Sequence, residues 1–374
     1  MTHLAEILRA ADPAAHGFEQ IVVWGGAATL ERVEPRPWLM KCHQPALDAG
    51  PGRRIWWQRF ELAALARYAG CDALLAPGGA NSGGFQPVVA MSRNMLPFEW
   101  RELLRYRWTL TGLRLLLLRV TQTQTFRRSE GLIFLTRYAR DTVMGVIKSV
   151  GGLTAIIPHG VDSRFFHSPR AQLPIDRYTV ERPFRVLYVS GIDLYKHQWH
   201  VAAAIARLRE SGLPIALDLI GQAYPPALAR LREALQELDP HGEFVCYAGP
   251  VPNGQLHARY LEADLCVFAS SCENMPNILL EGMASGLPIS CSNRGPMFEV
   301  LGDAGVYFDP ERPEDIARAL CELIGSPQQR SRLAQAAYQR AQGYSWQRCA
   351  CETLDFLADV VRAHSARRAL SERC

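Results

Sequence analysis

The sequence lacks the features that mark membrane-spanning, secreted or metal-binding chains. It has no run of 18 or more apolar residues, so we expect no membrane-spanning helix. Its start, MTHLAEILRAADPAAHG, has no basic stretch followed by an apolar core, which argues against a signal peptide. The ten cysteines include no CxxC pair, a pattern typical of thiols in a reducing compartment and not of a disulfide framework or a zinc site. These absences predict a cytoplasmic location.

Two common phosphate-binding motifs are also missing. Residues 78–84, GGANSGG, are rich in glycine, but they have neither the GxGxxG spacing nor a following Lys-Ser or Lys-Thr. The dinucleotide dehydrogenase and P-loop kinase classes therefore lose their main support. We interpret this stretch as a flexible surface turn, and the alternative is a loop that approaches a ligand closely. No DxD-like cluster is present, so we predict no metal site.

The chain has the composition of a globular protein with two domains. Its 374 residues are enough for two cores, and 48% of them are hydrophobic against 21% charged. Apolar runs alternate with helical patterns, which predicts an α/β fold with doubly wound parallel sheets. We expect strands near residues 21–24, 38–42, 72–76, 87–91, 131–135 and 155–158, then near 184–190, 215–220, 244–247, 265–268, 288–291 and 306–308. Helices are expected near residues 56–68, 99–122 and 137–148, and a polar linker at 163–183.

Positive charge is concentrated in the first half of the chain. Residues 1–164 carry 20 basic and 13 acidic side chains, a net charge of +7, whereas the remainder has a net charge of −3. Within residues 101–128, seven arginines flank or interrupt a leucine-rich run, and Glu102 is the only acid. Such a segment can lie at a membrane surface, or it can be a core helix with solvated arginines. Nucleic acid is not expected as a partner, since no binding motif accompanies the charge.

Residues 266–295 place two carboxylates around the start of one short helix. A buried strand is expected just before it, with Pro276 at the first helical position and Asn274 as the N-cap. The N–H groups and dipole at such a helix start favour an anion such as a diphosphate. Glu281 lies one turn inside the helix on the face of Asn277, where it can accept hydrogen bonds from ribose hydroxyls. Glu273, in the preceding loop, can reach the hydroxyls of the group that the diphosphate carries.

The same residues resemble a known donor site. The order Glu273-Asn274-Met275-Pro276-Asn277, then Glu281-Gly282-Met283-Ala284, Gly286, Pro288, Gly295 and Phe298-Glu299-Val300 is similar to the signature of the retaining glycosyltransferases of family 4, with the glycogen-synthase-like GT-B fold. The segments 157–162 and 187–196 extend the resemblance, which covers roughly residues 130–360. It implies two Rossmann-like domains facing each other across a cleft.

The resemblance also implies roles for individual residues. Lys196, with Gly191 a few residues before it, matches the phosphate-binding turn, and residues 273–277 with Glu281 match the nucleotide-sugar contacts. Many relatives carry an arginine where this chain has Gly191, Ile192 and Asp193, so one expected cation is missing. The family implies metal-independent chemistry with retention, in which Lys196 stabilises the leaving phosphate and Glu273 orients the sugar without acting as a covalent nucleophile.

The sequence differs from the family's pattern at two further places, both in the first domain. Where relatives supply a histidine near the donor sugar, this chain has Asn94, which can hydrogen-bond a hydroxyl or simply form a turn. Residues 4–11 already look like the family's first helix, so its first strand and glycine-rich loop are expected to be missing. We predict an acceptor-side domain at 1–170, a donor-binding domain at 171–345, and a helix at 346–374 that crosses back to the first domain.

We therefore predict a retaining hexosyltransferase that uses a nucleoside-diphosphate sugar as donor substrate and needs no cofactor. The expected acceptor is a glycan, plausibly a lipid-linked bacterial polysaccharide precursor, and residues 101–128 are the candidate membrane contact. One alternative is a non-catalytic subunit that only binds nucleotide sugar, and another is a GT-B sugar-nucleotide epimerase. The donor base and sugar stay open among GDP-mannose, UDP-glucose and UDP-N-acetylglucosamine.

Overall fold

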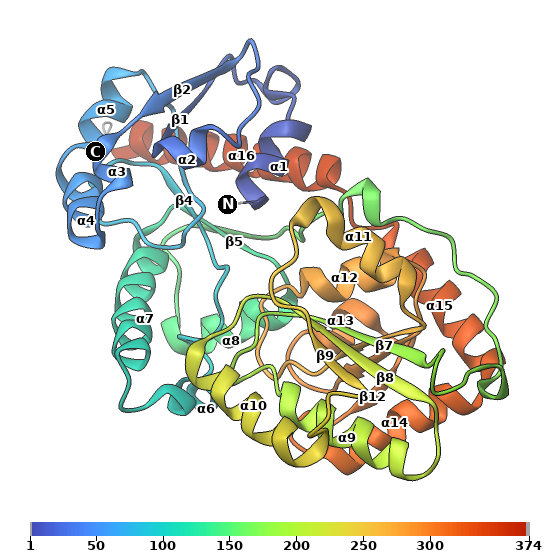
Figure 1. The fold of residues 1–374 in the computed structure, drawn as a ribbon. Helices are drawn as coiled ribbons and strands as arrows, with labels where there is room; N and C mark the ends of the chain where they lie inside the picture. The colour runs from blue at the N-terminus through green and yellow to red at the C-terminus, as the bar shows by residue number, and fades with distance from the viewer. Residues whose placement is uncertain (1, 372–374) are drawn as a thin grey trace. The chain divides into compact units, whose positions relative to one another are not determined.

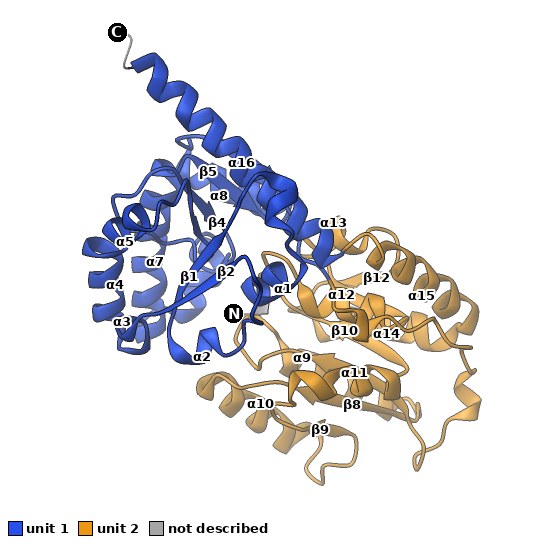
Figure 2. Ribbon diagram, turned by 90° about the horizontal axis from the view of Figure 1, so that it is seen from above, with its two compact units in different colours: residues 1–160, 345–374 blue, residues 161–344 orange. Residues whose placement is uncertain are grey.

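The structure, a computed structural model, describes residues 2–371 and divides into two compact units (Figure 2). Unit 1 runs to Gly160 and resumes at Ser345, and unit 2 comprises Val161–Tyr344. The first boundary lies before the predicted residue 170, because the polar segment that follows Gly160 packs within unit 2. The His167 amide donates to the Ala284 carbonyl at 3.0 Å, and the Arg170 guanidinium donates to the Leu261 carbonyl at 2.8 Å.

Unit 2 is built on a parallel sheet of six strands. In chain order they are β7 (Phe184–Val189), β8 (Ile215–Ile220), β9 (Val245–Tyr247), β10 (Leu265–Phe268), β11 (Ile289–Ser292) and β12 (Val306–Phe308). Their order in the sheet is β12-β11-β10-β7-β8-β9, so the first strand is central and pairs with both β8 and β10. All four residues of β10 and of β11 are buried, as the continuous apolar sequence LCVF of β10 predicts for an interior parallel strand.

Helices cover both faces of this sheet (Figure 1). The segment before β7 holds two short 3₁₀ turns, η3 (Ser163–Phe165) and η4 (Ile175–Arg177). The helices are α9 (Gln198–Glu210), α10 (Pro225–Leu238), α11 (Asn253–Glu262), α12 (Asn277–Ala284), α13 (Met297–Leu301), α14 (Pro313–Gly325) and α15 (Pro327–Ala341). Helix α9 packs against α10 and α14, and α12 packs against α15. These crossover helices give unit 2 the doubly wound architecture expected from the sequence.

Unit 1 has two separate parallel sheets within the described residues. One pairs β1 (Ile21–Gly25) with β2 (Leu39–His43), and the other has the order β3 (Leu74–Ala76), β4 (Val88–Met91), β5 (Gly131–Phe134) and β6 (Leu153–Ile156). Every residue of β4 and β5 is buried, whereas β1 and β3 are only partly buried. The expected strands of unit 1 are thus all present, but they do not join into one sheet.

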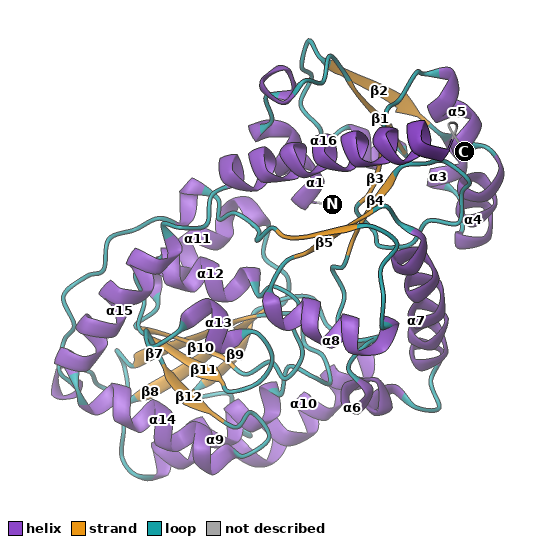
Figure 3. Cartoon of the chain, turned by 180° about the vertical axis from the view of Figure 1, so that it is seen from behind, coloured by secondary structure: helices purple, strands orange, loops and turns teal. Residues whose placement is uncertain are grey.

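The helices of unit 1 include the last helix of the chain (Figure 3). They are α1 (Thr2–Ala10), η1 (Pro13–His16), α2 (Ala27–Leu30), α3 (Pro45–Asp48), α4 (Pro51–Phe60), α5 (Leu62–Tyr68), α6 (Trp100–Leu103), η2 (Leu104–Tyr106), α7 (Leu110–Arg128), α8 (Arg137–Ile147) and α16 (Trp346–Ser371). Helix α16 packs on α1, η1 and β5. A Cβ at Gly131 of β5 would lie 2.7 Å from Val360 of α16, so glycine permits this close approach.

Two helices that the sequence predicts as continuous are interrupted. The predicted helix 56–68 is divided into α4 and α5 at Glu61, and the predicted helix 99–122 is divided into α6, η2 and α7. Between η2 and α7, Trp108 has a φ of 65°, a left-handed conformation that ends a helix. Thr109 then caps α7 by accepting a hydrogen bond from the Gly112 amide.

Arg330 of α15 is fully buried and holds three segments of unit 2 together. Its guanidinium donates to the Leu323 and Ile324 carbonyls at the end of α14, at 2.7 and 2.6 Å, and to the side chain of Gln172 at 3.1 Å. Removing it leaves buried carbonyls without donors, so we expect Arg330→Met to lower the free energy of unfolding of unit 2 by about 3 kcal/mol. Hydrogen exchange of the β7, β8 and β10 amides measures that change.

The matched control is Arg332→Met on the same helix, since Arg332 is exposed. We expect it to change the stability by no more than about 0.5 kcal/mol. Equal effects of the two substitutions would contradict a structural role for the buried guanidinium.

Candidate functional site

Two loops at the carboxyl edge of the unit 2 sheet are joined by hydrogen bonds. One follows β7 and the other follows β10, and these strands are neighbours although a long stretch of chain separates them. The Ser271 amide donates to the Tyr195 carbonyl at 2.8 Å, and a ring nitrogen of His197 lies 3.0 Å from the Ser271 hydroxyl. The strand order reverses between β7 and β10, and such a switch point is where doubly wound sheets bind ligands.

The two loops bring Lys196 and Glu273 into a direct ion pair. The Lys196 ammonium group contacts a carboxylate oxygen of Glu273. Lys196 is only 7% exposed, and its charged group lies over the rings of Tyr195 and Phe268, at 4.9 and 5.3 Å from the ring centroids. The Tyr188 hydroxyl fixes the backbone by donating to the Lys196 carbonyl at 2.7 Å. The structure thus assembles two predicted site residues that lie far apart in the sequence.

Helix α12 begins later than predicted. Its first residue is Asn277 and its N-cap is Pro276, so the predicted assignment of Asn274 as N-cap and Pro276 as first helical residue is wrong. The reason is local: Asn274 is buried, and the Asn277 amide donates back to the Met275 carbonyl at 3.0 Å before the helix starts. Met275 and Pro276 are also buried, whereas Asn277 is exposed at the start of the helix.

Glu281 projects from the first turns of α12 into an enclosed polar position. The Tyr260 hydroxyl, on a fully buried side chain of α11, donates to its carboxylate at 3.0 Å. Burial raises the pKa of the Glu281 carboxyl group to about 7, the Tyr260 hydrogen bond and the charge of Arg164 lower it, and the charge of Asp162 raises it. The carboxyl group can therefore gain or lose a proton near neutral pH.

Gly191 lies at the end of β7 with an exposed backbone. Its carbonyl accepts a hydrogen bond from the Gln198 side chain at 2.9 Å, and a Cβ at this position would lie 3.3 Å from the Gln222 carbonyl. The turn between Gly191 and Lys196 is closed by the Lys196 amide, which donates to the Asp193 carbonyl at 3.0 Å. A glycine here leaves room for the chain to pass close to its neighbours.

Sequence reasoning missed several residues that complete these contacts. They are Tyr188, Tyr195, His197, Tyr260 and Ser271. His197 has a φ of 54°, caps α9 and is fully buried, with its ring stacked on that of His200 at 5.3 Å. The adjacency of Tyr195 and His197 to Lys196 was a signal in the sequence, whereas Tyr188, Tyr260 and Ser271 make their contacts through tertiary packing.

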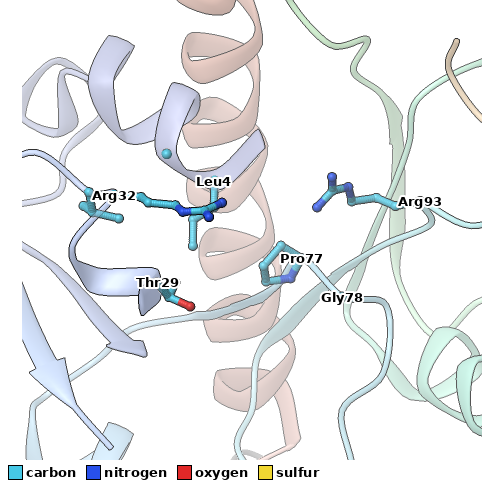
Figure 4. A pocket seen from close by; sticks show the side chains of 8 residues that line it. Leu4, Thr29, Arg32, Pro77, Gly78 and Arg93 are labelled. Atoms are coloured by element: carbon cyan, nitrogen blue, oxygen red, sulfur yellow. The ribbon is translucent and has the colours of Figure 1, made fainter. Parts of the chain in front are cut away.

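Asn94 lies in unit 1, after β4. Its carboxamide oxygen accepts a hydrogen bond from the Leu96 amide at 3.1 Å, which is the turn-forming arrangement considered for it from the sequence. Its neighbour Arg93 is directed into a small cavity of about 150 Å³, which Leu4, Thr29, Arg32, Pro77 and Gly78 also line (Figure 4). Burial lowers the pKa of the Arg93 guanidinium.

One group of potential metal ligands exists among residues 2–371. It comprises His16, Cys351 and Asp355 of unit 1, where a His16 ring nitrogen lies 2.7 Å from an Asp355 carboxylate oxygen. Two of the three side chains are exposed, and none belongs to the predicted site. The described part of the chain also has no helix that is long and apolar enough to cross a membrane.

Comparison with known sequences identifies the family. Residues 175–340, which lie within unit 2, match the family described as "Glycosyl transferases group 1". Unit 2 belongs to the group 1 glycosyl transferases. A similar curated protein is the D-inositol 3-phosphate glycosyltransferase of Paenarthrobacter aurescens, 26% identical over 212 residues. That alignment covers 55% of this chain and 52% of the relative, so the chain spans about half the length of the relative that it matches.

Solved structures show that the whole chain has the GT-B fold. Sucrose-phosphate synthase from Thermosynechococcus elongatus superimposes with a TM-score of 0.71 at 18% identity, covering 99% of this chain and 93% of that one. Anabaena Alr3699/HepE, whose structure holds UDP and glucose, gives a TM-score of 0.63 at 18% identity over 98% and 95% of the two chains. At these identities the likeness concerns the fold, which agrees with the α/β class predicted from the sequence.

The raised pKa of Glu281 makes the stability of unit 2 depend on pH. The folded state holds the proton up to about pH 7, whereas the unfolded chain loses it near pH 4.5. Stability is therefore lost as the pH rises from about 4.5 through 7, by up to about 3 kcal/mol. Glu281→Gln removes this loss, so we expect the variant to gain stability relative to the wild type across that range in urea unfolding at pH 5, 6, 7 and 8.

The control is Glu262→Gln at the end of α11, since Glu262 is exposed and pairs with Arg259 at 3.0 Å. Its unfolding curve should follow that of the wild type at every pH, apart from a small constant offset. Parallel pH profiles for Glu281→Gln and the wild type would show that the carboxyl group is ionised throughout.

Proposed function

We propose that this chain is a retaining glycosyltransferase that moves a hexose from a nucleoside-diphosphate sugar to a glycan acceptor, without a metal ion. The observation that carries the proposal is the Lys196–Glu273 pair at the switch point of the unit 2 sheet. A partly buried ion pair adds little to stability, because desolvating the charges offsets their attraction. A cation and a carboxylate held at a ligand-binding edge are better explained by a diphosphate that carries a sugar.

Each residue of the ion pair has a separate role toward the nucleoside-diphosphate sugar. Lys196 supplies positive charge to the diphosphate, and the start of α12 supplies backbone N–H groups and a helix dipole. Glu273 accepts hydrogen bonds from the sugar hydroxyls once the phosphate competes for Lys196. In the transfer, the bond between the anomeric carbon and the phosphate oxygen breaks and a bond to the acceptor oxygen forms on the same face. The acceptor proton passes to the departing phosphate, whose negative charge Lys196 stabilises.

Glu281 is proposed to accept hydrogen bonds from the ribose hydroxyls. Hydroxyl donors stabilise the ionised carboxylate, so a bound nucleotide opposes the effect of burial on its pKa. Tyr260 already occupies one carboxylate oxygen and thereby orients the group. Nucleotide affinity should accordingly be greater above pH 7 than below it.

Nucleotide binding tests the site directly. UDP, GDP, ADP, TDP and their sugars are screened by thermal shift, with and without a chelator. At about 100 times its dissociation constant, the preferred ligand should stabilise the fold by roughly 2.7 kcal/mol. We expect the shift to survive the chelator and to be lost in Lys196→Met and Glu281→Ala. Lys148→Met is the control, because Lys148 is an exposed lysine of unit 1 and the substitution is the same.

Turnover separates an enzyme from a binding protein. Release of free sugar from the donor identified in the screen should be slower in Glu273→Gln by about 100-fold or more, while nucleotide binding persists. Nucleotide binding with no sugar release in the wild type would favour the non-catalytic subunit. Release of an epimerised sugar and of no free hexose would instead favour the epimerase. Loss of the shift only in the presence of chelator would contradict the metal-independent mechanism.

Exposed apolar side chains of α7 and of the residues just before it, which we call the α7 surface, support a membrane contact for a lipid-linked acceptor. Between residues 100 and 120, the large apolar side chains that are at least half exposed are Trp100, Trp108, Leu110, Leu113, Leu117 and Val120. Arg101, Arg107 and Arg114 are exposed beside them. Helix α4 lies near one end of α7 in Figures 1 and 3, and its Ile55, Trp56 and Phe60 side chains are also exposed. An apolar surface flanked by arginines fits the interface of an anionic bilayer, which here would be the cytoplasmic face of the membrane.

Vesicle flotation tests this surface. We expect the wild type to bind vesicles containing anionic phosphatidylglycerol, and Leu113→Ser with Leu117→Ser to weaken binding at least about tenfold through lost apolar burial. The control combines Val180→Ser with Leu370→Ser, which removes exposed apolar side chains outside this surface. Binding should also fall with salt. Equal binding by both double variants would rule out the α7 surface as the contact.

A further inference from the structure

Three side chains of different chemistry meet where η1 packs against α16. They are His16, the last residue of η1, and Cys351 and Asp355 of α16. Residues four apart on a helix lie on the same face, so the thiol and the carboxylate project side by side. The ligand atoms of the three side chains all lie within 4.8 Å of one another. All three residues belong to unit 1, coloured blue in Figure 2, whereas the Lys196–Glu273 pair belongs to unit 2.

The Asp355 carboxylate is the central group of this cluster. Its Oδ1 atom lies 2.7 Å from Nδ1 of His16, and its Oδ2 atom accepts a hydrogen bond from the Cys351 thiol at 3.7 Å. In a nucleophilic triad the histidine stands between the cysteine and the carboxylate, so that the imidazole can take the thiol proton. Here the carboxylate stands in the middle, so the arrangement is not that of a nucleophilic triad.

The three donor atoms match the ligands of a zinc ion. Zinc binds imidazole nitrogen, thiolate sulfur and carboxylate oxygen at about 2.0 to 2.3 Å in a tetrahedron, which places neighbouring ligand atoms roughly 3.3 to 3.6 Å apart. The two distances from Asp355, 2.7 and 3.7 Å, lie on either side of that range. Displacements of about 1 Å therefore bring the three atoms onto one zinc ion. Calcium and magnesium bind through oxygen and would gain nothing from the sulfur and the nitrogen.

The backbone around His16 holds its ring in place. Pro13 begins η1 and is buried, and the Phe18 amide donates to the Pro13 carbonyl at 3.0 Å. Gly17 follows with a φ of 82°, which glycine adopts without strain, and its amide donates to the Ala14 carbonyl at 3.2 Å. The His16 side chain is only 10% exposed. A ligand fixed in this way loses little conformational freedom on binding a metal.

The other two ligands are accessible to a cation. The Asp355 side chain is 63% exposed, and Cys351 is exposed as well. Within residues 2–371, Asp355 pairs with no lysine or arginine. Arg348, one turn earlier on α16, is paired with Glu352 at 2.6 Å. A divalent cation can therefore approach a carboxylate whose charge none of the described lysines and arginines neutralises.

We propose that His16, Cys351 and Asp355 bind one zinc ion, which fastens η1 to α16. The Cys351 thiol gives up its proton to solvent and binds as a thiolate, the imidazole binds through Nδ1, and the carboxylate binds through an oxygen atom. A water molecule completes the tetrahedron. Motif spacing in the sequence could not indicate this site, because His16 and Asp355 are 339 positions apart. The inference does not depend on the proposed sugar transfer.

Metal binding to the full chain tests the site. The protein is freed of metal with a chelator and titrated with zinc, and separately with cobalt, whose spectrum reports the ligands. We expect the tightest-bound zinc at one ion per chain, and for cobalt a thiolate charge-transfer band together with the visible bands of tetrahedral coordination. Cys351→Ser should weaken zinc binding by at least about 100-fold and abolish the charge-transfer band, because it removes the sulfur ligand.

The matched control is Cys321→Ser, since Cys321 is an exposed cysteine of α14 in unit 2. It should keep the zinc affinity and the cobalt spectrum of the wild type. Lys196→Met should keep them too, so that a failure of the donor site and a failure of the zinc site are told apart. Equal zinc affinity in Cys351→Ser and the wild type, or a cobalt complex without the thiolate band, would overturn the proposal.

Hydrogen exchange shows whether the metal fastens η1 to α16. At about 100 times its dissociation constant, zinc should slow exchange of the Gly17 and Phe18 amides, which close η1, at least about tenfold, because opening η1 breaks the site. Calcium at the same concentration should leave exchange unchanged. Without metal, Cys351→Ser should exchange like the wild type, since its side chain is exposed. Equal slowing by zinc in this variant and in the wild type would contradict the assignment.

Discussion

The pairing of β7 with β10 is the constraint on which the candidate site depends. Parallel pairing of these two strands brings their carboxyl ends together, and the loops that follow them are then tied by the contacts of Tyr195 and His197 with Ser271. Lys196 and Glu273 meet only because of this pairing. A lysine ammonium group that is almost excluded from water needs a partner of opposite charge, and the loop after β10 supplies it.

The carboxylates Glu273 and Glu281 are alike in sequence but differ in environment. Glu273 pairs with a cation on a loop, whereas Glu281 is held by the Tyr260 hydroxyl and experiences opposing charges from Asp162 and Arg164. Burial dominates at Glu281 and raises its pKa to about 7. The fold thus places one carboxylate beside a cation and buries the other, whose charge changes near neutral pH.

The two units differ in the continuity of their sheets. In unit 2 the central strand β7 is nearly all buried and connects both halves of the sheet. In unit 1 the halves stand on either side of a cavity, held by helices α1 and α16 on one face and α4 and α5 on the other. The half-buried state of β1 and β3 follows from this gap, because their apolar side chains and open edges lack a neighbour.

The sequence by itself determined the class of fold, the strands and the positions of Lys196, Glu273 and Glu281, since these follow from local apolar runs and from motif spacing. It misplaced the start of α12, because the sequence permits either Asn274 or Pro276 as the N-cap, and the hydrogen bond from the Asn277 amide to the Met275 carbonyl decides between them. Only the tertiary structure decided the ion pair, the Tyr260 contact and the division of unit 1 into two sheets, because each depends on which strands are neighbours in space.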